Sequence, residues 1–267
     1  MNNKIEGILS KKNYNFEDLV VIVSILRGEG GCPWDIEQTH KSIRDDLIEE
    51  TYEVIEAIDT DDSALLREEL GDVLLQIVFH SGIETDAGVF TIDDVCDEIC
   101  KKMIVRHPHV FGDTVVKNTS DVLKNWESIK SNEKQRNTVT DKLNAIPKQL
   151  PALMRATKVG SKASCFDFAD TDSVISKLDE EVSELKTAIS HNDRDNVYEE
   201  IGDLLLTVTS LCRKLEINAE RALNDATTKF INRFEKVETE CIKSGRNIKN
   251  VQMSELDEIW EQIKHKS

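Results

Sequence analysis

The segments LIEETYEV at residues 47–54 and LREELGD at residues 66–72 carry four acidic residues in a pattern that the chain later repeats. The second copy lies in LDEEVSEL at 178–185 and EEIGD at 199–203. A constant offset of 131 residues pairs the acids: Glu50 with Glu181, Glu53 with Glu184, Glu69 with Glu200, and Asp72 with Asp203. Apolar residues around each pair recur at helical spacing, which predicts two antiparallel helices per copy. We expect these helices at about 39–58 and 63–83, and at about 172–189 and 193–215.

The repeated acids predict two metal sites. Acids three residues apart on a helix are neighbours, and these acids border the apolar stripe. Uncompensated burial of so many charges is costly, which favours a bound cation. Oxygen ligands without His or Cys favour Mg²⁺, with Mn²⁺ as a substitute. A solvated acidic face is the alternative in a chain that is 32% charged, but repetition of all four acids at one offset favours metal.

The composition is typical of an all-α protein with two domains. Aromatic residues make up only 5% of the 267 residues, and there are four prolines and eleven glycines. We expect a first domain over residues 1–130, a linker over the polar segment 131–151 with its two prolines, and a second domain over residues 152–267.

Charge and cysteine usage restrict the partners and the compartment. The net charge of −17 argues against nucleic acid or an anionic membrane as the main partner. No stretch approaches the ~20 apolar residues of a membrane span, and the first residues lack a signal-peptide pattern. The six cysteines have no zinc-like spacing and are interpreted as reduced thiols, so we expect a cytoplasmic protein.

Basic and aromatic residues repeat as well, in the same order after the acids. Lys102 and Arg106 correspond to Lys229 and Arg233, and Trp126 with Lys130 corresponds to Trp260 with Lys264. Alone, such pairs are usually surface ion-pair partners or core packing. Together with a metal they could bind a nucleoside polyphosphate, because cations hold phosphate oxygens and an indole stacks on a base. No GxxxxGK[ST] loop occurs, so attack of metal-activated water on phosphorus is the predicted chemistry.

The chain resembles the MazG family of the all-α nucleoside triphosphate pyrophosphohydrolases. The resemblance rests on the motifs GCPWD at 31–35, LIEETYEV at 47–54, LREELGDVLLQIVFH at 66–80, RHPHVFGD at 106–113, LPALMRATKV at 150–159 and EEIGDLLLTV at 199–208. It implies two tandem MazG-like helical bundle domains that hydrolyse NTPs, and dNTPs as well, to NMP and pyrophosphate. It also implies Mg²⁺ on the EExxE and ExxD acids, and a homodimer that builds the pocket.

The second repeat is expected to be the main catalytic site. Lys177 and Asn196 each stand four residues before a metal-site acid, whereas the first repeat has Asp46 and Leu65 at these positions. An extra acid and an apolar group suit a triphosphate less well. Glu180 or Glu181 would orient the water. The nucleotide-binding assignment comprises Lys177, Asn196, Glu199, Lys229, Arg233, Trp260 and Lys264.

One departure from the family pattern, Thr227 where an Asn is common, leaves the base and sugar contacts at that position open. Two other functions also remain open. One is hydrolysis of a non-standard or alarmone-like nucleotide, and the other is a non-catalytic helical protein that mediates dimerisation. The two repeats could also pack on each other instead of on a second chain.

Overall fold

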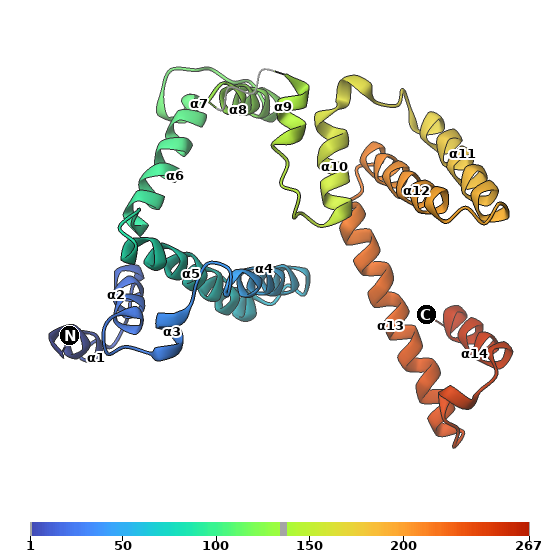
Figure 1. The fold of residues 1–267 in the computed structure, drawn as a ribbon, viewed down its shortest axis with the longest axis horizontal. Helices are drawn as coiled ribbons and strands as arrows, with labels where there is room; N and C mark the ends of the chain where they lie inside the picture. The colour runs from blue at the N-terminus through green and yellow to red at the C-terminus, as the bar shows by residue number, and fades with distance from the viewer. Residues whose placement is uncertain (1, 134–137, 267) are drawn as a thin grey trace. The chain divides into compact units, whose positions relative to one another are not determined.

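The computed structural model describes residues 2–133 and 138–266, and within them the chain forms helices and no strand (Figure 1). The chain divides into two units, Met1–Lys130 and Ser131–Ser267, called unit one and unit two below. Residues 134–137 of the expected linker lie outside the described residues, and a short helix, α9 (Val139–Asn144), lies inside the expected linker range. No described helix is long and apolar enough to cross a membrane.

Unit one is built mainly from two long helices, α4 and α5, with shorter helices around them. In order, its helices are α1 (Asn2–Leu9), α2 (Phe16–Arg27), α3 (Pro33–Glu37), α4 (Arg44–Asp59), α5 (Ser63–Asp86), α6 (Ile92–Arg106), α7 (Pro108–Phe111) and α8 (Thr119–Glu133), which ends just past the unit boundary. The α2 and α4 helices both pack on α5.

Unit two repeats this plan with a longer C-terminal part. After α9 come α10 (Ala152–Lys162), the 3₁₀ turn η1 (Ser164–Phe166), α11 (Thr171–Ser190), α12 (Arg194–Lys214), α13 (Ala219–Lys243), the 3₁₀ turn η2 (Ile248–Asn250) and α14 (Met253–Lys266). The α10 helix packs on α12, and α14 packs on α13. Figure 1 shows the α11–α12 and α13–α14 pairs as separate hairpins.

The same turn closes the two acidic hairpins, α4–α5 and α11–α12. Asp61 (φ 55°) and Asn192 (φ 53°) adopt the left-handed conformation that short polar residues tolerate best. The next residue in each turn caps the following helix: the Asp62 carboxylate accepts hydrogen bonds from the Ala64 and Leu65 amides, and Asp193 accepts one from the Asn196 amide. The turn therefore repeats at the 131-residue offset of the acids.

One detail of the sequence prediction for unit one is wrong. The first acidic helix begins at Arg44 instead of about residue 39, because Thr39 and Ser42 bond each other in a turn, with Thr39 N donating to Ser42 Oγ at 2.9 Å. The GCPWD motif at 31–35 contains the start of α3, where Pro33 occupies the first turn of a helix, a position that proline favours.

In each unit an arginine packs against a glycine where an earlier helix meets the acidic hairpin. The arginine is on the earlier helix in unit one and on the hairpin in unit two. In unit one Arg27 on α2 lies against Gly82 on α5, and a Cβ at Gly82 would lie 3.4 Å from Arg27 Cδ. In unit two Arg213 on α12 lies against Gly160 on α10, and a Cβ there would lie 3.1 Å from Arg213 Nε. Arg27 bonds Asp86, and Arg213 bonds Asp167.

Small cores and large exposed apolar faces characterise both units. One buried cluster consists of Val23, Ile43, Val78 and Phe79, and another of Val237, Cys241 and Ile263. Many apolar side chains on the long helices remain exposed, among them Ile48, Tyr52, Ile55, Leu70, Ile201, Leu205, Leu223, Phe230, Ile231 and Phe234. Each such side chain would contribute roughly 1.5–3 kcal/mol if it were fully buried.

Candidate functional site

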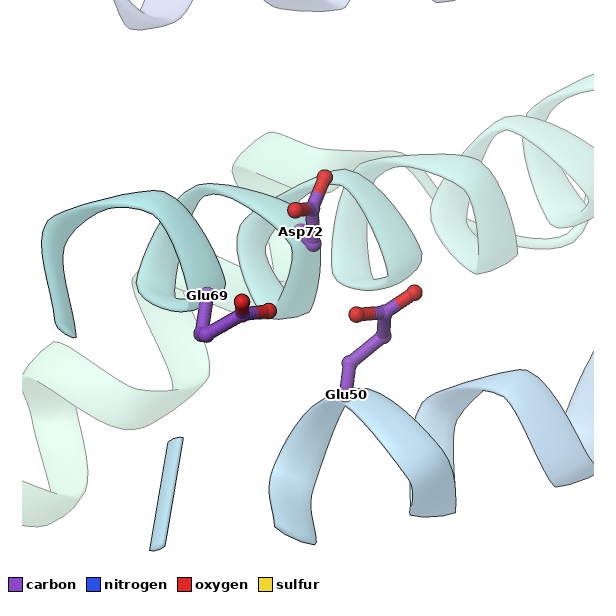
Figure 2. Close-up of side chains that lie close together, drawn as sticks. All are labelled: Glu50, Glu69 and Asp72. Carbon is purple, nitrogen blue, oxygen red and sulfur yellow. The ribbon is translucent and has the colours of Figure 1, made fainter. Parts of the chain in front are cut away.

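In unit one the acids of α4 and α5 converge between the two helices. Figure 2 shows Glu50 on α4 facing Glu69 and Asp72 on α5. One carboxylate oxygen from each of these three residues lies within 4.8 Å of the others. Glu69 is buried and Glu50 and Asp72 are half-buried. Glu53, the fourth predicted acid, is hydrogen-bonded to Glu50, so all four belong to one cluster.

This crowding of carboxylates shifts their protonation. Desolvation, the hydrogen bond that protonated Glu50 donates to Glu53, and the negative charge of Asp72 raise the pKa of Glu50 to about 7. Desolvation and the charges of Glu53 and Asp72 also raise the pKa of Glu69. The folded chain therefore holds these acids at an electrostatic cost that a cation would offset.

Unit two forms the equivalent cluster on α11 and α12. Carboxylate oxygens of Glu181, Glu184 and Glu200 lie within 4.8 Å of one another, and Glu181 is only 3% exposed. Desolvation and the charges of Glu184, Glu181 and Asp203 raise the pKa of Glu200, which places Asp203 beside the same cluster. The structure thus brings together the four acids that the repeat predicted in each unit.

A lysine distinguishes the cluster of unit two. The Lys177 ammonium donates to Glu180 Oε1 at 2.8 Å and lies 3.0 Å from Glu181 Oε1. These contacts raise the pKa of Lys177. Unit one has Asp46 at the same offset, so only the second cluster has a cation at this position. Asn196 and Glu199 lie on α12, where Asn196 is half-buried and Glu199 is exposed.

The predicted basic and aromatic residues of unit two lie on the other hairpin, α13–α14. Lys229 and Arg233 are on α13, and Trp260 and Lys264 are on α14. The Trp260 ring lies 5.2 Å from the Phe230 ring. Among the described residues the buried Nε of Arg233 has no hydrogen-bond partner, which leaves a donor available for a ligand. Lys264 bonds Glu261 at 3.2 Å.

Their counterparts in unit one also lie together. Arg106 is buried on α6, with its guanidinium carbon 5.4 Å from the Trp126 ring on α8. Lys102 pairs with Glu98 at 3.1 Å, and Lys130 is half-buried near the end of α8. Lys102 and Lys264 are each paired with a glutamate of their own helix, outside the two acidic clusters.

A cavity of about 410 Å³ opens beside the acids of unit two, and the sequence prediction missed it. Its lining includes Glu181 and Asp203 together with Thr207, Ser210 and Arg213 on α12. The Asp167 carboxylate lines it too and accepts two hydrogen bonds from Arg213, one of them at 2.8 Å. Both these bonds and an ion pair with Lys214 hold the pKa of Asp167 far below its usual value. The sequence contains one local signal at this place, the small Ser210 at the position that Phe79 occupies in unit one.

The donor sets fit a hard divalent cation. All ligand candidates are carboxylates, they converge to within 4.8 Å, and desolvation together with their mutual repulsion raises the pKa values of Glu50, Glu69 and Glu200. Oxygen-only sites of this kind suit Mg²⁺ better than Zn²⁺ or copper.

Comparison with known proteins identifies the repeated unit. The MazG nucleotide pyrophosphohydrolase domain matches residues 38–111 and 169–238. The chain is 43% identical over 251 residues to the nucleoside triphosphate pyrophosphohydrolase/pyrophosphatase MazG of Thermotoga maritima, covering 93% of this chain and 95% of that protein. It is 40% identical over 251 residues to the nucleoside triphosphate pyrophosphohydrolase of Escherichia coli K12, covering 92% and 95%. The uncharacterized protein YabN of Bacillus subtilis is 40% identical over 254 residues, covering 94% of this chain and 52% of YabN.

Proposed function

We propose, from the premise that the chain belongs to the MazG family and is a nucleoside triphosphate pyrophosphohydrolase, that unit two is its principal active site and Mg²⁺ its cation. The observation that carries this proposal is the convergence of Glu181, Glu184 and Glu200, with Asp203 beside them and Lys177 paired to Glu181. Glu181, Glu184, Glu200 and Asp203 would hold the cation. When bound, it would neutralise phosphate oxygens and make water more acidic.

The side chains around the acids have separate roles in this proposal. Glu180 or Glu181 accepts the proton of the water that attacks the α-phosphorus, the bond to the β-phosphate breaks, and pyrophosphate leaves. Lys177 is placed to take a phosphate oxygen when it releases Glu180 or Glu181. Asn196 and Glu199, which flank the cluster on α12, complete the nucleotide site on this hairpin.

Matched substitutions in the two units test the assignment. Glu200→Gln removes one negative charge from the second cluster without changing its shape, so we expect pyrophosphate release from NTPs to fall at least ~100-fold, or about 2.7 kcal/mol in the activation free energy. Glu69→Gln makes the same change in unit one and serves as the control. Unchanged turnover in Glu200→Gln, with loss of turnover in Glu69→Gln, would place the principal site in unit one.

We further propose that two copies of the chain form a homodimer that completes each site. The Lys229, Arg233, Trp260 and Lys264 side chains lie on a hairpin separate from the acids. Phe230, Ile231 and Phe234, next to these bases on α13, are 56%, 59% and 43% exposed. Ile201 and Leu205 beside the acids on α12 are also exposed. A second copy that covered these faces would bring its bases and Trp260 to the phosphates.

Mixed dimers distinguish completion by a second chain from completion within one chain. Glu200→Gln lacks the acid and Arg233→Met lacks the base, so each pure variant should be inactive. If the groups come from different chains, mixing the two variants restores one intact site in each mixed dimer, or about a quarter of the wild-type activity after random exchange. No recovery after verified exchange, or a monomer by analytical ultracentrifugation, would contradict the shared site.

A further inference from the structure

The cavity beside the acids of unit two has mixed walls. Val159, Phe168 and Leu206 provide apolar surface, and Glu181 and Asp203 form the end at the candidate metal site. Its volume of about 410 Å³ lies in the ordinary range for small-molecule sites. If a cation on the acids held the triphosphate of an NTP, this adjoining space could take the nucleoside.

A hydroxyl group that makes no hydrogen bond to the described residues lines this cavity. Thr207 is only 6% exposed and lines the cavity, and within the described part of the chain its hydroxyl makes no hydrogen bond. Its neighbour Thr209 bonds the Leu206 carbonyl at 2.8 Å, and Ser210 bonds the same carbonyl at 3.2 Å. A ligand in the cavity could therefore take a hydrogen bond from the Thr207 hydroxyl in place of water.

The charged wall of the cavity is preformed and internally paired. Arg213 and Lys214 both contact the Asp167 carboxylate, and the Asp167 side chain also accepts a bond from the Phe168 amide at 2.9 Å. Lys214 donates to the Phe168 carbonyl at 2.6 Å. These contacts fix the segment that precedes α11 against α12. The wall shapes the cavity, while the Thr207 hydroxyl is available to a ligand.

The equivalent positions of unit one carry bulkier side chains. Phe79 stands at the offset of Ser210 and Gln76 at the offset of Thr207. Phe79 is 6% exposed and belongs to the core of unit one, with the Arg27 guanidinium 5.0 Å from its ring centre. The repeats share their acids but differ at the two positions that shape the cavity.

From this juxtaposition we infer that the cavity is a nucleoside pocket, in which Thr207 bonds the sugar or base of the NTP and Ser210 leaves room for it. The inference rests on the proposed active site in unit two and adds the part of the substrate that the acids do not contact. Because Thr207 offers one hydroxyl and the charged wall is paired internally, the pocket selects by size and shape more than by base identity.

Thr207→Val tests the hydrogen bond without changing the size of the side chain. It removes a hydroxyl that has no hydrogen bond to the described residues to lose, so the free chain should be about as stable as the wild type. The KM for NTPs should nevertheless rise about 3–10-fold, which corresponds to a lost hydrogen bond. The inhibition constant of inorganic tripolyphosphate with Mg²⁺, a probe that lacks a nucleoside, should stay within about twofold.

Ser210→Phe tests the space by copying the residue of unit one. The added ring should raise the KM for all NTPs at least ~10-fold, and more for purines than for pyrimidines, while tripolyphosphate inhibition persists. Ser161→Phe adds the same side chain at an exposed site on α10 outside the cavity lining and serves as the control. Thermal unfolding of all three variants checks that they fold.

The measurements distinguish an error in the nucleoside pocket from an error in the proposed pyrophosphohydrolase function. If wild-type chain turns over NTPs but Thr207→Val and Ser210→Phe both leave every KM within about twofold, the nucleoside lies elsewhere and the inference is wrong. If Ser210→Phe loses tripolyphosphate inhibition as well, the ring has disturbed the acids, and Thr207→Val alone decides by its KM. A wild-type chain that releases no pyrophosphate from any NTP contradicts the proposed function first.

Discussion

The two acidic hairpins have the same turn and the same four acids but different surroundings. In unit two Lys177 compensates part of the negative charge and a cavity adjoins the acids. In unit one Asp46 adds a negative residue at the lysine position, and Phe79 is part of the core. The comparison teaches that one acidic hairpin can be kept while the residues beside it change, with a lysine and a cavity in one unit and an acid and a packed aromatic ring in the other.

The largest difference should appear when the charge of unit two is changed to that of unit one. Lys177→Asp replaces the cation beside Glu181 with a residue that repels both the acid and the triphosphate. We expect kcat/KM for NTPs to fall about 100-fold or more, measured by pyrophosphate release. The reciprocal Asp46→Lys should leave turnover within about twofold; if instead it raises turnover strongly, unit one carries part of the activity.

A smaller effect is expected from the ion pair that forms the cavity wall. Arg213→Met leaves Asp167, which is 15% exposed, without its main partner, and should lower the free energy of unfolding by about 2–3 kcal/mol at pH 7. Because the folded pKa of Asp167 is depressed, this stabilisation exists above its unfolded pKa and is lost as the pH falls through the folded value. Denaturant unfolding at pH 7 and at about pH 2 measures both. Equal losses at the two pH values would contradict an electrostatic origin.

The smallest effect concerns the free energy of unfolding that unit one loses by holding its acids close together. The pKa of Glu50 is raised to about 7, so its contribution to stability is present at low pH and is lost as the pH rises through that value. Without divalent cations, Glu50→Gln should therefore raise the unfolding temperature by roughly 2–4 °C at pH 8, and by less at pH 5. With saturating Mg²⁺ the order should reverse, because the wild type gains more from the cation. If the variant is less stable than the wild type without cations, the Glu50 carboxylate does not destabilise the fold electrostatically.

The acidic hairpins could be predicted from the sequence because their determinants are local. Helical spacing of apolar residues and acids three residues apart both act within one or two turns of helix, and the constant offset of 131 residues displays the same local pattern twice. The helix caps at Asn15 and Thr91 are local too, since each forms a capping box with the residue three positions later. These signals explain why the structure brings Glu50 and Glu181 to their expected partners.

The cavity could not be predicted in the same way, because its walls come from distant segments. Asp167 and Arg213 are 46 residues apart, and their pairing depends on how α10 packs on α12. The unpaired state of the Thr207 hydroxyl is also a tertiary property, since threonine hydroxyls in helices often bond the preceding turn. The start of α4 was misplaced for a related reason: a turn at Thr39 competes with the helical pattern.

The exchange of arginine and glycine between the units limits how the repeats can be recombined. A chimera that grafts α12 into unit one would set Arg213 against Arg27, so two guanidinium groups would compete for one space. The opposite graft would place Gly82 against Gly160 and leave Asp167 without its arginine. The two repeats place the arginine and the glycine on opposite helices. Each hairpin can therefore be transplanted only together with the helix that carries the other member of its pair, α2 in unit one and α10 in unit two.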